Sequence, residues 1–182
     1  MKFIETGIKD LFVVEPDVFG DSRGWFSESY NKSVFIKNKV KIEFVQDNHS
    51  YSANKGVLRG LHFQNNPFAQ TKLVRCTKGK IWDVAVDLRK SSPTYLKWYG
   101  LELTAENHKM LFVPQGFAHG FVTLEDHTEV QYKVDNVYDK PSDRSIRFDD
   151  PQIAIEWPIS DVILSDKDKN APLFKDSDAN FI

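Results

Sequence analysis

Residues 57–64, Val57-Leu58-Arg59-Gly60-Leu61-His62-Phe63-Gln64, decide how the rest of this chain is interpreted. The segment begins with apolar residues, the first of them β-branched, which is typical of a short strand. Side chains alternate between the two faces of a strand, so every second residue from Leu58 to Gln64 is expected on one side. That side carries a histidine, a glutamine and a glycine that leaves room for a ligand. The segment therefore predicts a strand in the wall of a binding site.

A second histidine stands in a similar setting, Pro114-Gln115-Gly116-Phe117-Ala118-His119-Gly120-Phe121. Both histidines lie beside glycine on separate candidate strands, which favours one shared cavity. A single histidine of this kind is as often a satisfied core or surface residue as a functional one. Two of them, together with the polar residues described below, favour a site.

Length and composition restrict the class of protein. We expect residues 1–182 to form a single domain, because this length suits one domain with a sizeable core. The net charge of -2 argues against a nucleic-acid partner but not against a small anionic ligand, which local cations can bind. The chain shows no signal-peptide core and no membrane-spanning run, so we expect a cytoplasmic protein with no membrane partner. Cys76, alone in an apolar run, is expected to be a buried and unreactive thiol.

Short apolar runs separated by turn signals recur along the chain and predict an all-β sandwich or barrel. Jelly rolls and cupins fit this number of strands and place their sites inside the barrel. Helix signals are few: Ser33 is expected to cap a short helix over Val34–Ile36, and another is expected near the end of the chain. The candidate strands are Leu11–Glu15, Trp25–Tyr30, Ile42–Gln46, Val57–Gln64, Lys72–Cys76, Ile81–Leu88, Trp98–Leu103, Met110–Val113, Gly120–Leu124, Glu129–Val134 and Ile153–Ile155.

The candidate strand Ile81–Leu88 has one apolar face and one mixed face that carries Asp83 and Asp87. If the mixed face lines the cavity, Asp83 lies inside it. The alternative is a solvent-facing side, which is common in antiparallel sheets, and the sequence alone favours this alternative.

The polar residues of the candidate strands allow two kinds of chemistry. A metal-binding cupin usually offers a His-x-His pair, and Gln64 breaks that pair here, so a metal held by His62, His119 and a carboxylate is the weaker reading. Without a metal, histidine, lysine and tyrosine in one pocket suit proton abstraction beside a carbonyl. Nucleophile elbows and glycine-rich phosphate loops are missing, so hydrolase and triphosphatase readings lack support. The residues collected are Arg59, His62, Gln64, Lys72, Asp83, His119 and Tyr132.

Several segments in a fixed order resemble the dTDP-4-dehydrorhamnose 3,5-epimerase family. Each piece is weak by itself, but the ordered set begins at Phe19–Gly24 and covers nearly the whole chain. The other segments are Val57–Gln64, Lys72–Cys76, Trp82–Arg89, Ser92–Tyr95, Val113–Phe121 and Leu164–Asp168.

The resemblance implies a cupin-type jelly roll that works without a cofactor or a metal. Its substrate would be a dTDP-4-keto-6-deoxy sugar, inverted at C3 and C5, the two carbons beside the keto group, in dTDP-L-rhamnose biosynthesis. Among matching positions, His62 would be the general base and Asp168 its carboxylate partner. Tyr132 would donate a proton on the opposite sugar face, and Lys72 would be the cation near the keto oxygen.

The resemblance also implies a homodimer and a set of binding residues. In similar proteins, N-terminal strands such as the one with Arg23 and Glu28 cross to the partner subunit, and a C-terminal segment, here about 158–182, closes the site. Asp143 stands where the family more often has glutamate, and its shorter side chain reaches less far toward the nucleotide, which weakens the case for that contact. Thymine would stack on Tyr138 or Phe26. The implied substrate-binding positions are Arg23, Glu28, Gln46, Asn48, Arg59, Lys72, His119, Asp143 and Lys167.

Other functions stay open at this point. One is a relative that epimerises only C3 or only C5 of a related dTDP-4-keto-6-deoxy sugar. Another is a metal-dependent cupin oxygenase or isomerase. A non-catalytic sugar-binding cupin is disfavoured, because binding alone does not require a tyrosine facing a His–Asp pair.

Overall fold

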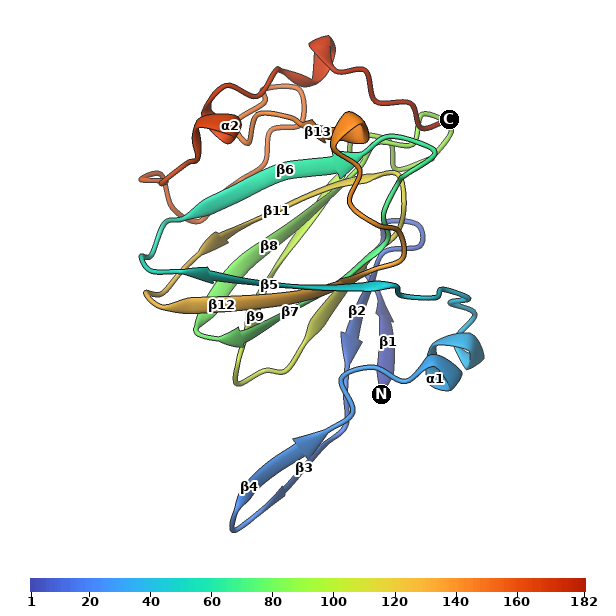
Figure 1. Cartoon of the computed structure of the whole chain (residues 1–182), viewed down its shortest axis with the longest axis vertical. Helices are drawn as coiled ribbons and strands as arrows, with labels where there is room; N and C mark the ends of the chain where they lie inside the picture. The colour runs from blue at the N-terminus through green and yellow to red at the C-terminus, as the bar shows by residue number, and fades with distance from the viewer.

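The computed structural model describes residues 1–182, and they fold into two antiparallel sheets with a projecting hairpin (Figure 1). The all-β prediction is confirmed. The first sheet runs in the order β1 (Lys2–Glu5), β2 (Phe12–Glu15), β10 (Met110–Val113), β7 (Lys72–Lys78), β12 (Thr128–Val134) and β5 (Gln46–Ser52). The second sheet runs β13 (Asp143–Ser145), β6 (Leu58–Gln64), β11 (Phe117–Thr123), β8 (Lys80–Asp87) and β9 (Trp98–Thr104).

The remaining elements are short and lie outside the two sheets. The helices are α1 (Lys32–Lys37) and α2 (Asp166–Lys169), and two single 3₁₀ turns cover Lys140–Ser142 and Phe174–Asp176. None of the helices has the length and apolar character that crossing a membrane requires.

The sheets pack face to face around an apolar core. Val74, Leu111 and Phe121 belong to its largest cluster, and each is at most 4% exposed. Full burial of side chains of this size contributes about 1.5–3 kcal/mol each. A second cluster forms on the outer side of the five-stranded sheet, where the C-terminal part of the chain contributes Ile153 and Phe181. The C-terminal segment therefore covers the face of this sheet that points away from the first one.

Both faces of β8 are buried, so the reading of its mixed face as solvent-facing is wrong. Asp83 and Asp87 are 0% exposed. On the opposite face, Val84 and Val86 pack in the cluster that the C-terminal segment covers. The C-terminal segment covers the outer, apolar face of β8, so the mixed face of β8 points into the space between the two sheets. The alternative that places Asp83 inside the cavity region is therefore correct.

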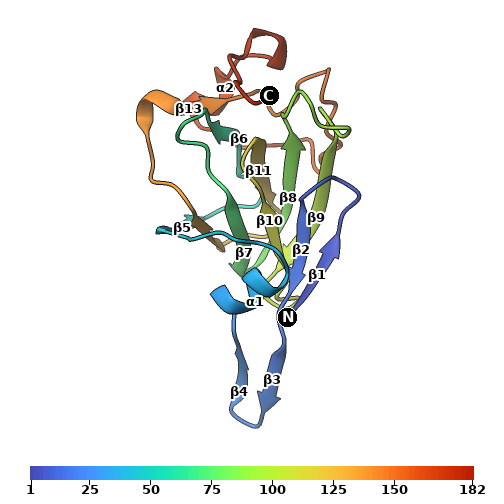
Figure 2. The same cartoon turned by 90° about the vertical axis from the view of Figure 1, so that its right-hand side faces the viewer.

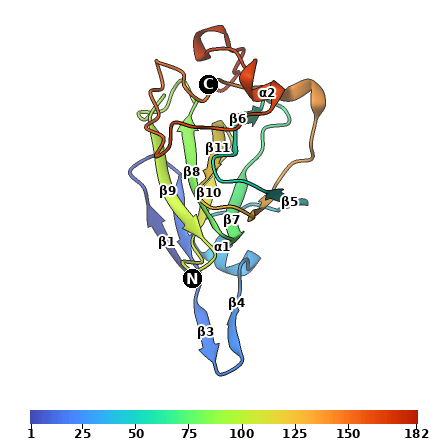
Figure 3. The ribbon, with the colours of Figure 1, turned by 90° about the vertical axis from the view of Figure 1, so that its left-hand side faces the viewer.

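A two-stranded hairpin, β3 (Val18–Asp21) and β4 (Gly24–Ser27), pairs with no other strand. Figures 1, 2 and 3 show it projecting from one end of the molecule. Phe19, Trp25 and Phe26 on this hairpin are 64%, 63% and 66% exposed. Large apolar side chains that gather on an isolated hairpin are typical of a surface that contacts another molecule, because their exposure to water is unfavourable.

Two candidate strands are wrong. In Ile42–Gln46 only Gln46 is in a strand, because Ile42 and Phe44 pack against the cluster around α1 instead of pairing. Residues 153–155 form no strand: Ile153 is buried in a turn, where its N–H donates to Asp150 Oδ1 over 3.1 Å.

The helix near residue 34 is confirmed, but its cap is wrong. Asn31 is the N-cap of α1, and its Oδ1 accepts from the N–H groups of Ser33 and Val34 at 3.0 and 3.4 Å. Asparagine and serine are both good caps, so spacing alone could not separate them. The helix expected near the end of the chain is α2, capped by Ser165.

Candidate active site

A cavity of about 480 Å³ lies between the two sheets and takes its walls from both. Arg59, His62 and His119 line it from β6 and β11 of the five-stranded sheet. Lys72 and Tyr132 line it from β7 and β12 of the six-stranded sheet. The other lining residues are Ser50, Val57, Leu58, Phe121, Ile163, Leu164, Ser165 and Asp168. The cavity therefore has side chains that can transfer protons on both of its opposite walls.

A second hollow of about 290 Å³ adjoins the first, because His62, Lys72 and Tyr132 line both. Together they form one elongated cleft with these three residues at its middle. The second hollow is also lined by Gln46, Asn48, Phe63, Gln64, Gln70, Tyr138, Asp143 and Lys167.

A bulge in β6 decides which of its side chains reach the cleft. His62 pairs with His119 and Arg59 pairs with Phe121, so three steps along β6 match two along β11. The extra residue lets Arg59 and His62 line the same cavity, while Leu61 packs in the outer core. The strict alternation expected from Leu58 to Gln64 is therefore wrong at this point.

Two further features of this strand have structural roles. A Cβ on Gly60 would lie 2.6 Å from Gly120 Cα, so close approach of β11, rather than a ligand, requires glycine there. Gln64 donates from Nε2 to the carbonyl oxygens of Phe68 at 2.7 Å and Val137 at 3.1 Å. Its amide holds two loops in place.

His62 and Asp168 form a close pair at the centre of the cleft. Asp168 Oδ1 lies 2.5 Å from His62 Nε2, and its Oδ2 accepts from the Ser165 hydroxyl at 2.8 Å. Asp168 is 4% exposed, whereas the His62 side chain is 30% exposed and reaches the cavity. Burial alone would raise the pKa of the Asp168 carboxyl, but the bonds from His62 and Ser165 leave this pKa below its usual range.

Lys72 and Tyr132 stand together on the opposite wall. Lys72 Nζ lies 5.9 Å from the centre of the Tyr132 ring, and no carboxylate lies within ion-pair distance of it. Burial lowers the pKa of Lys72 to about 8, against the opposing charges of Asp83 and Asp143. Burial also raises the pKa of the Tyr132 hydroxyl, so this group stays protonated at neutral pH.

His119 and Asp83 form a second pair deeper in the same wall as His62. His119 Nε2 lies 2.8 Å from Asp83 Oδ1, and the two residues are 6% and 0% exposed. Burial lowers the pKa of His119, although Asp83 acts in the opposite direction.

The second hollow carries a linked set of polar groups. Lys167 Nζ lies 2.6 Å from Asp143 Oδ2, to which the Tyr138 hydroxyl also donates at 3.3 Å. On β5, Gln46 Nε2 donates to Asn48 Oδ1 at 2.9 Å, and Gln46 Oε1 accepts from the Tyr138 N–H at 3.4 Å. Five residues that the sequence placed in the site therefore meet here.

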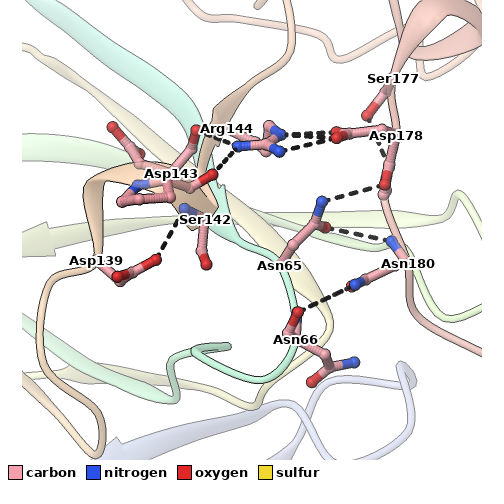
Figure 4. A network of polar contacts seen from close by, with 11 residues as sticks. Asn65, Asn66, Asp139, Ser142, Asp143, Arg144, Ser177, Asp178 and Asn180 are labelled. Atoms are coloured by element: carbon pink, nitrogen blue, oxygen red, sulfur yellow. Dashed lines mark hydrogen bonds and ion pairs between the residues drawn. The ribbon is translucent and has the colours of Figure 1, made fainter.

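The strand that carries Asp143 is held from behind by the C-terminal tail (Figure 4). Arg144 points away from the cleft and forms a two-pronged contact with Asp178, with Nε 2.7 Å from Oδ1 and Nη2 2.9 Å from Oδ2. Its Nη1 donates to the Asp143 carbonyl at 3.0 Å. Asn180 ties the same tail to Asn65, whose Oδ1 accepts from the Asn180 N–H at 3.2 Å. Bidentate arginine–carboxylate contacts hold geometry well, so β13 keeps a fixed place beside β6.

Arg23 and Glu28 do not reach the cleft of their own chain. Arg23, on the hairpin, pairs with Asp21 at 2.5 Å, and its side chain is 87% exposed. Glu28 accepts from Asn31 Nδ2 at 3.1 Å. Phe26 lies on the same hairpin, so of the two candidate stacking residues only Tyr138 lines the cleft of this chain.

Ser165 and Ser50 are lining residues that sequence reasoning missed. Ser165 had a usable signal, because serine three residues before Asp168 is a capping pattern, and the Asp168 N–H donates to its hydroxyl at 3.1 Å. Ser50 has no comparable signal in the sequence.

The family model described as dTDP-4-dehydrorhamnose 3,5-epimerase matches residues 5–176. A protein of that name from Shigella flexneri is 55% identical over 179 residues, which cover 98% of each chain.

Solved structures agree with this result. The dTDP-4-dehydrorhamnose 3,5-epimerase from Bacillus anthracis, with TDP and PPi bound, superposes with a TM-score of 0.93 at 54% identity, covering 95% of this chain and 99% of that one. The dTDP-6-deoxy-D-glucose-3,5-epimerase from Legionella pneumophila Philadelphia 1, in complex with dTDP-4-keto-L-rhamnose, has a TM-score of 0.92 at 43% identity and covers 96% and 93%. The expected cupin-type architecture is confirmed by these neighbours.

Proposed function

The chain belongs to the dTDP-4-dehydrorhamnose 3,5-epimerase family, and we propose that its cleft converts dTDP-4-dehydro-6-deoxy-D-glucose to dTDP-4-dehydro-L-rhamnose through His62 and Tyr132. The observation that carries this assignment of roles is the placement of a His–Asp pair and a protonated tyrosine on opposite walls of one cavity. Inversion of a carbon needs a base on one face and a proton donor on the other. The two walls offer both.

His62 would act as the base through Nδ1. A carboxylate can only accept hydrogen bonds, so the 2.5 Å contact to Asp168 requires the proton of His62 to be on Nε2. The lone pair then lies on Nδ1, which has no protein partner. After proton abstraction, the carboxylate stabilises the imidazolium, as in other catalytic histidine pairs.

Histidine alone is too weak a base for this reaction. A ketone α-proton lies about a dozen pKa units above a free histidine, and each unit corresponds to about 1.36 kcal/mol. A preorganised donor at the developing enolate oxygen supplies about 3–4 kcal/mol, and exact orientation supplies more. Lys72 is the suited cation, because it has no carboxylate within ion-pair distance and its charge is free for the substrate.

Tyr132 would return the proton on the opposite face. Its hydroxyl stays protonated because burial raises its pKa, so it is a donor rather than a base at neutral pH. The nucleotide would occupy the second hollow, where Gln46, Asn48, Asp143 and Lys167 offer polar groups and Tyr138 offers a ring for thymine. Arg59 and His119 would contact phosphate or sugar oxygens in the first cavity.

We further infer that two chains form a homodimer in which the hairpin reaches the partner's cleft. Arg23 and Phe26 would then serve the partner subunit, together with Glu28, because none of the three contacts the cleft of its own chain. The exposed rings of Phe19, Trp25 and Phe26 would be buried by the partner.

Incubation with the 4-keto-6-deoxyglucose nucleotide in deuterated water tests the reaction. We expect label at both C3 and C5 and an L-configured product by NMR. Label at one carbon only would identify a single-position epimerase, and label at neither with substrate bound would remove the assignment. Treatment with EDTA should leave activity unchanged, since the acid–base set requires no Lewis acid, whereas loss restored by zinc, iron or manganese would support a metal-dependent cupin.

A further inference from the structure

Asp83 is a buried carboxylate that the proposed reaction leaves unused. It lies at the middle of β8, paired with Phe121 on one side and Leu101 on the other, and is 0% exposed. Oδ1 has one partner, His119, whereas Oδ2 is buried without any hydrogen-bond partner. Its neighbours on the same strand face, Ile81 and Ala85, belong to the apolar core. A carboxylate in such surroundings is unfavourable for folding, so its presence here indicates a role other than stabilising the fold.

Both groups on which Asp83 acts line the cavity. His119 donates from Nε2 the one hydrogen bond that the Asp83 side chain accepts, and no carboxylate lies within ion-pair distance of Lys72. Burial lowers the pKa of Lys72, and Asp83 is the foremost negative charge that opposes this effect, ahead of Asp143. The charged or titratable groups around Lys72 are Asp83 on β8, His119 on β11, Arg59 and His62 on β6, Tyr132 on β12, Asp143 on β13, and Lys167 and Asp168 on α2.

We propose that Asp83 is a positioning residue that holds His119 in the tautomer protonated on Nε2 and keeps Lys72 charged beside the substrate. In this tautomer the His119 Nδ1 lone pair accepts a hydrogen bond from a substrate hydroxyl, so His119 recognises sugar rather than acting as a phosphate-binding cation. The neutral state agrees with the effect of burial, which lowers the pKa of His119. This role rests on the proposed function.

Asp87 offers a matched control for Asp83. It lies four residues further along β8 and is also a 0% exposed aspartate. Its partners are Arg89, Ser92 and Thr94, none of which lines the cleft. Asp87→Asn therefore removes a buried charge from the same strand without touching the site.

The first test compares the pH dependence of kcat between pH 6 and 9.5 in wild type, Asp83→Asn and Asp87→Asn. Asp83→Asn removes the charge, and because its amide can donate as well as accept, it also no longer restricts His119 to the tautomer protonated on Nε2. We expect its alkaline limb to move to lower pH by at least about half a unit, which makes the relative loss at least about 2.5-fold larger at pH 8.5 than at pH 6.5. Asp87→Asn should keep the wild-type limb. A uniform loss at every pH in Asp83→Asn would reduce Asp83 to a structural residue.

The second test measures the tautomer of His119 in the wild-type protein. It therefore tests the proposal even if Asp83→Asn does not fold. Histidine is labelled with ¹⁵N, and the His119 signals are assigned by their loss in His119→Gln. We expect a neutral ring protonated on Nε2 at pH 7.5. Protonation on Nδ1 or on both nitrogens would overturn the proposal. This readout needs no turnover, so its failure is distinct from failure of the epimerase assignment.

Discussion

Asp168 Oδ1 lies 2.5 Å from His62 Nε2, although 106 residues separate them along the chain. The contact forms because a parallel bridge between Val57 and Ile163 brings the C-terminal segment alongside the start of β6. Ser165 then caps α2 and holds the second oxygen of Asp168. The pair is therefore set by the docking of one segment, and several expected properties depend on it.

Removing either member of this pair should impair turnover. We expect His62→Ala to lower kcat by at least about a hundredfold, the usual effect of losing a general acid–base group. Asp168→Asn should also be harmful, because an amide can favour the wrong imidazole tautomer. Steady-state kinetics with the nucleotide sugar measures both. Full activity in Asp168→Asn would show that another group orients His62.

Tyr132→Phe should separate proton exchange from inversion. The change removes one hydroxyl and keeps the ring, so packing is retained, while delivery from the opposite face is impaired. His62 can still remove and return the proton on its own side, so deuterium should enter C3 and C5 faster than inverted product forms. NMR of one sample gives both quantities. An equal fall in the two would restrict Tyr132 to binding.

Lys72 should produce the alkaline limb of the pH profile. Its ammonium is needed at the enolate oxygen, so activity should fall as pH rises through about 8, where Lys72 loses its proton. In the unfolded chain this pKa is near 10.4, so the folded state binds fewer protons between these values and stability rises with pH across that window. Lys72→Met should therefore lower kcat yet stabilise the fold at pH 7 by about 1–3 kcal/mol, measured by urea unfolding. If Lys72→Met is less stable than the wild type, burial of the Lys72 charge does not cost stability as expected here.

Asp87 should stabilise the fold in a pH-dependent way. Burial tends to raise the pKa of its carboxyl, but bonds from Arg89, Ser92 and Thr94 leave it lowered. The resulting stability is present above the unfolded value near 3.9 and is lost as pH falls below it. Asp87→Asn should cost about 2 kcal/mol at pH 7, since Arg89 loses its charged buried partner and keeps only the half-exposed Asp10 as an ion-pair partner. Thermal unfolding at pH 7 and pH 3.5 should show that difference shrinking in acid; an unchanged difference would assign the effect to packing.

Mixing two inactive variants tests the shared cleft. Arg23→Ala damages the hairpin and His62→Ala damages the cleft, so a mixed dimer contains one intact site. After denaturation and refolding of equal amounts together, random pairing should restore about a quarter of wild-type activity. The separately refolded variants serve as controls. If the mixture shows only their average, the hairpin does not serve the partner.

Much of the sheet structure could be predicted, because strands buried on at least one face have apolar runs between turn signals. Met110–Val113 matches β10 in both bounds, and the strand around His62 is displaced by one residue at its start. The strand Asp143–Ser145 was missed. Its residues are polar, and only pairing with β6, a distant segment, makes it a strand.

The residues of the site could be predicted more fully than the directions in which their side chains point. The residue types pointed to acid–base chemistry, but the bulge that turns Arg59 toward His62 depends on the match between β6 and β11. The side of β8 that carries Asp83 depends on the C-terminal cover. Both are tertiary effects, which local sequence does not encode.

The place of α2 in the chain has a consequence for biosynthesis. A ribosome delivers the chain from its N-terminus, so Asp168 emerges after every strand of both sheets, whereas His62 emerges before most of them. A nascent chain can thus assemble its sheets around a histidine that still lacks its carboxylate. Acid–base competence arises only when residues 163–168 dock beside β6, so translation supplies every strand of the two sheets before it supplies the carboxylate of the pair.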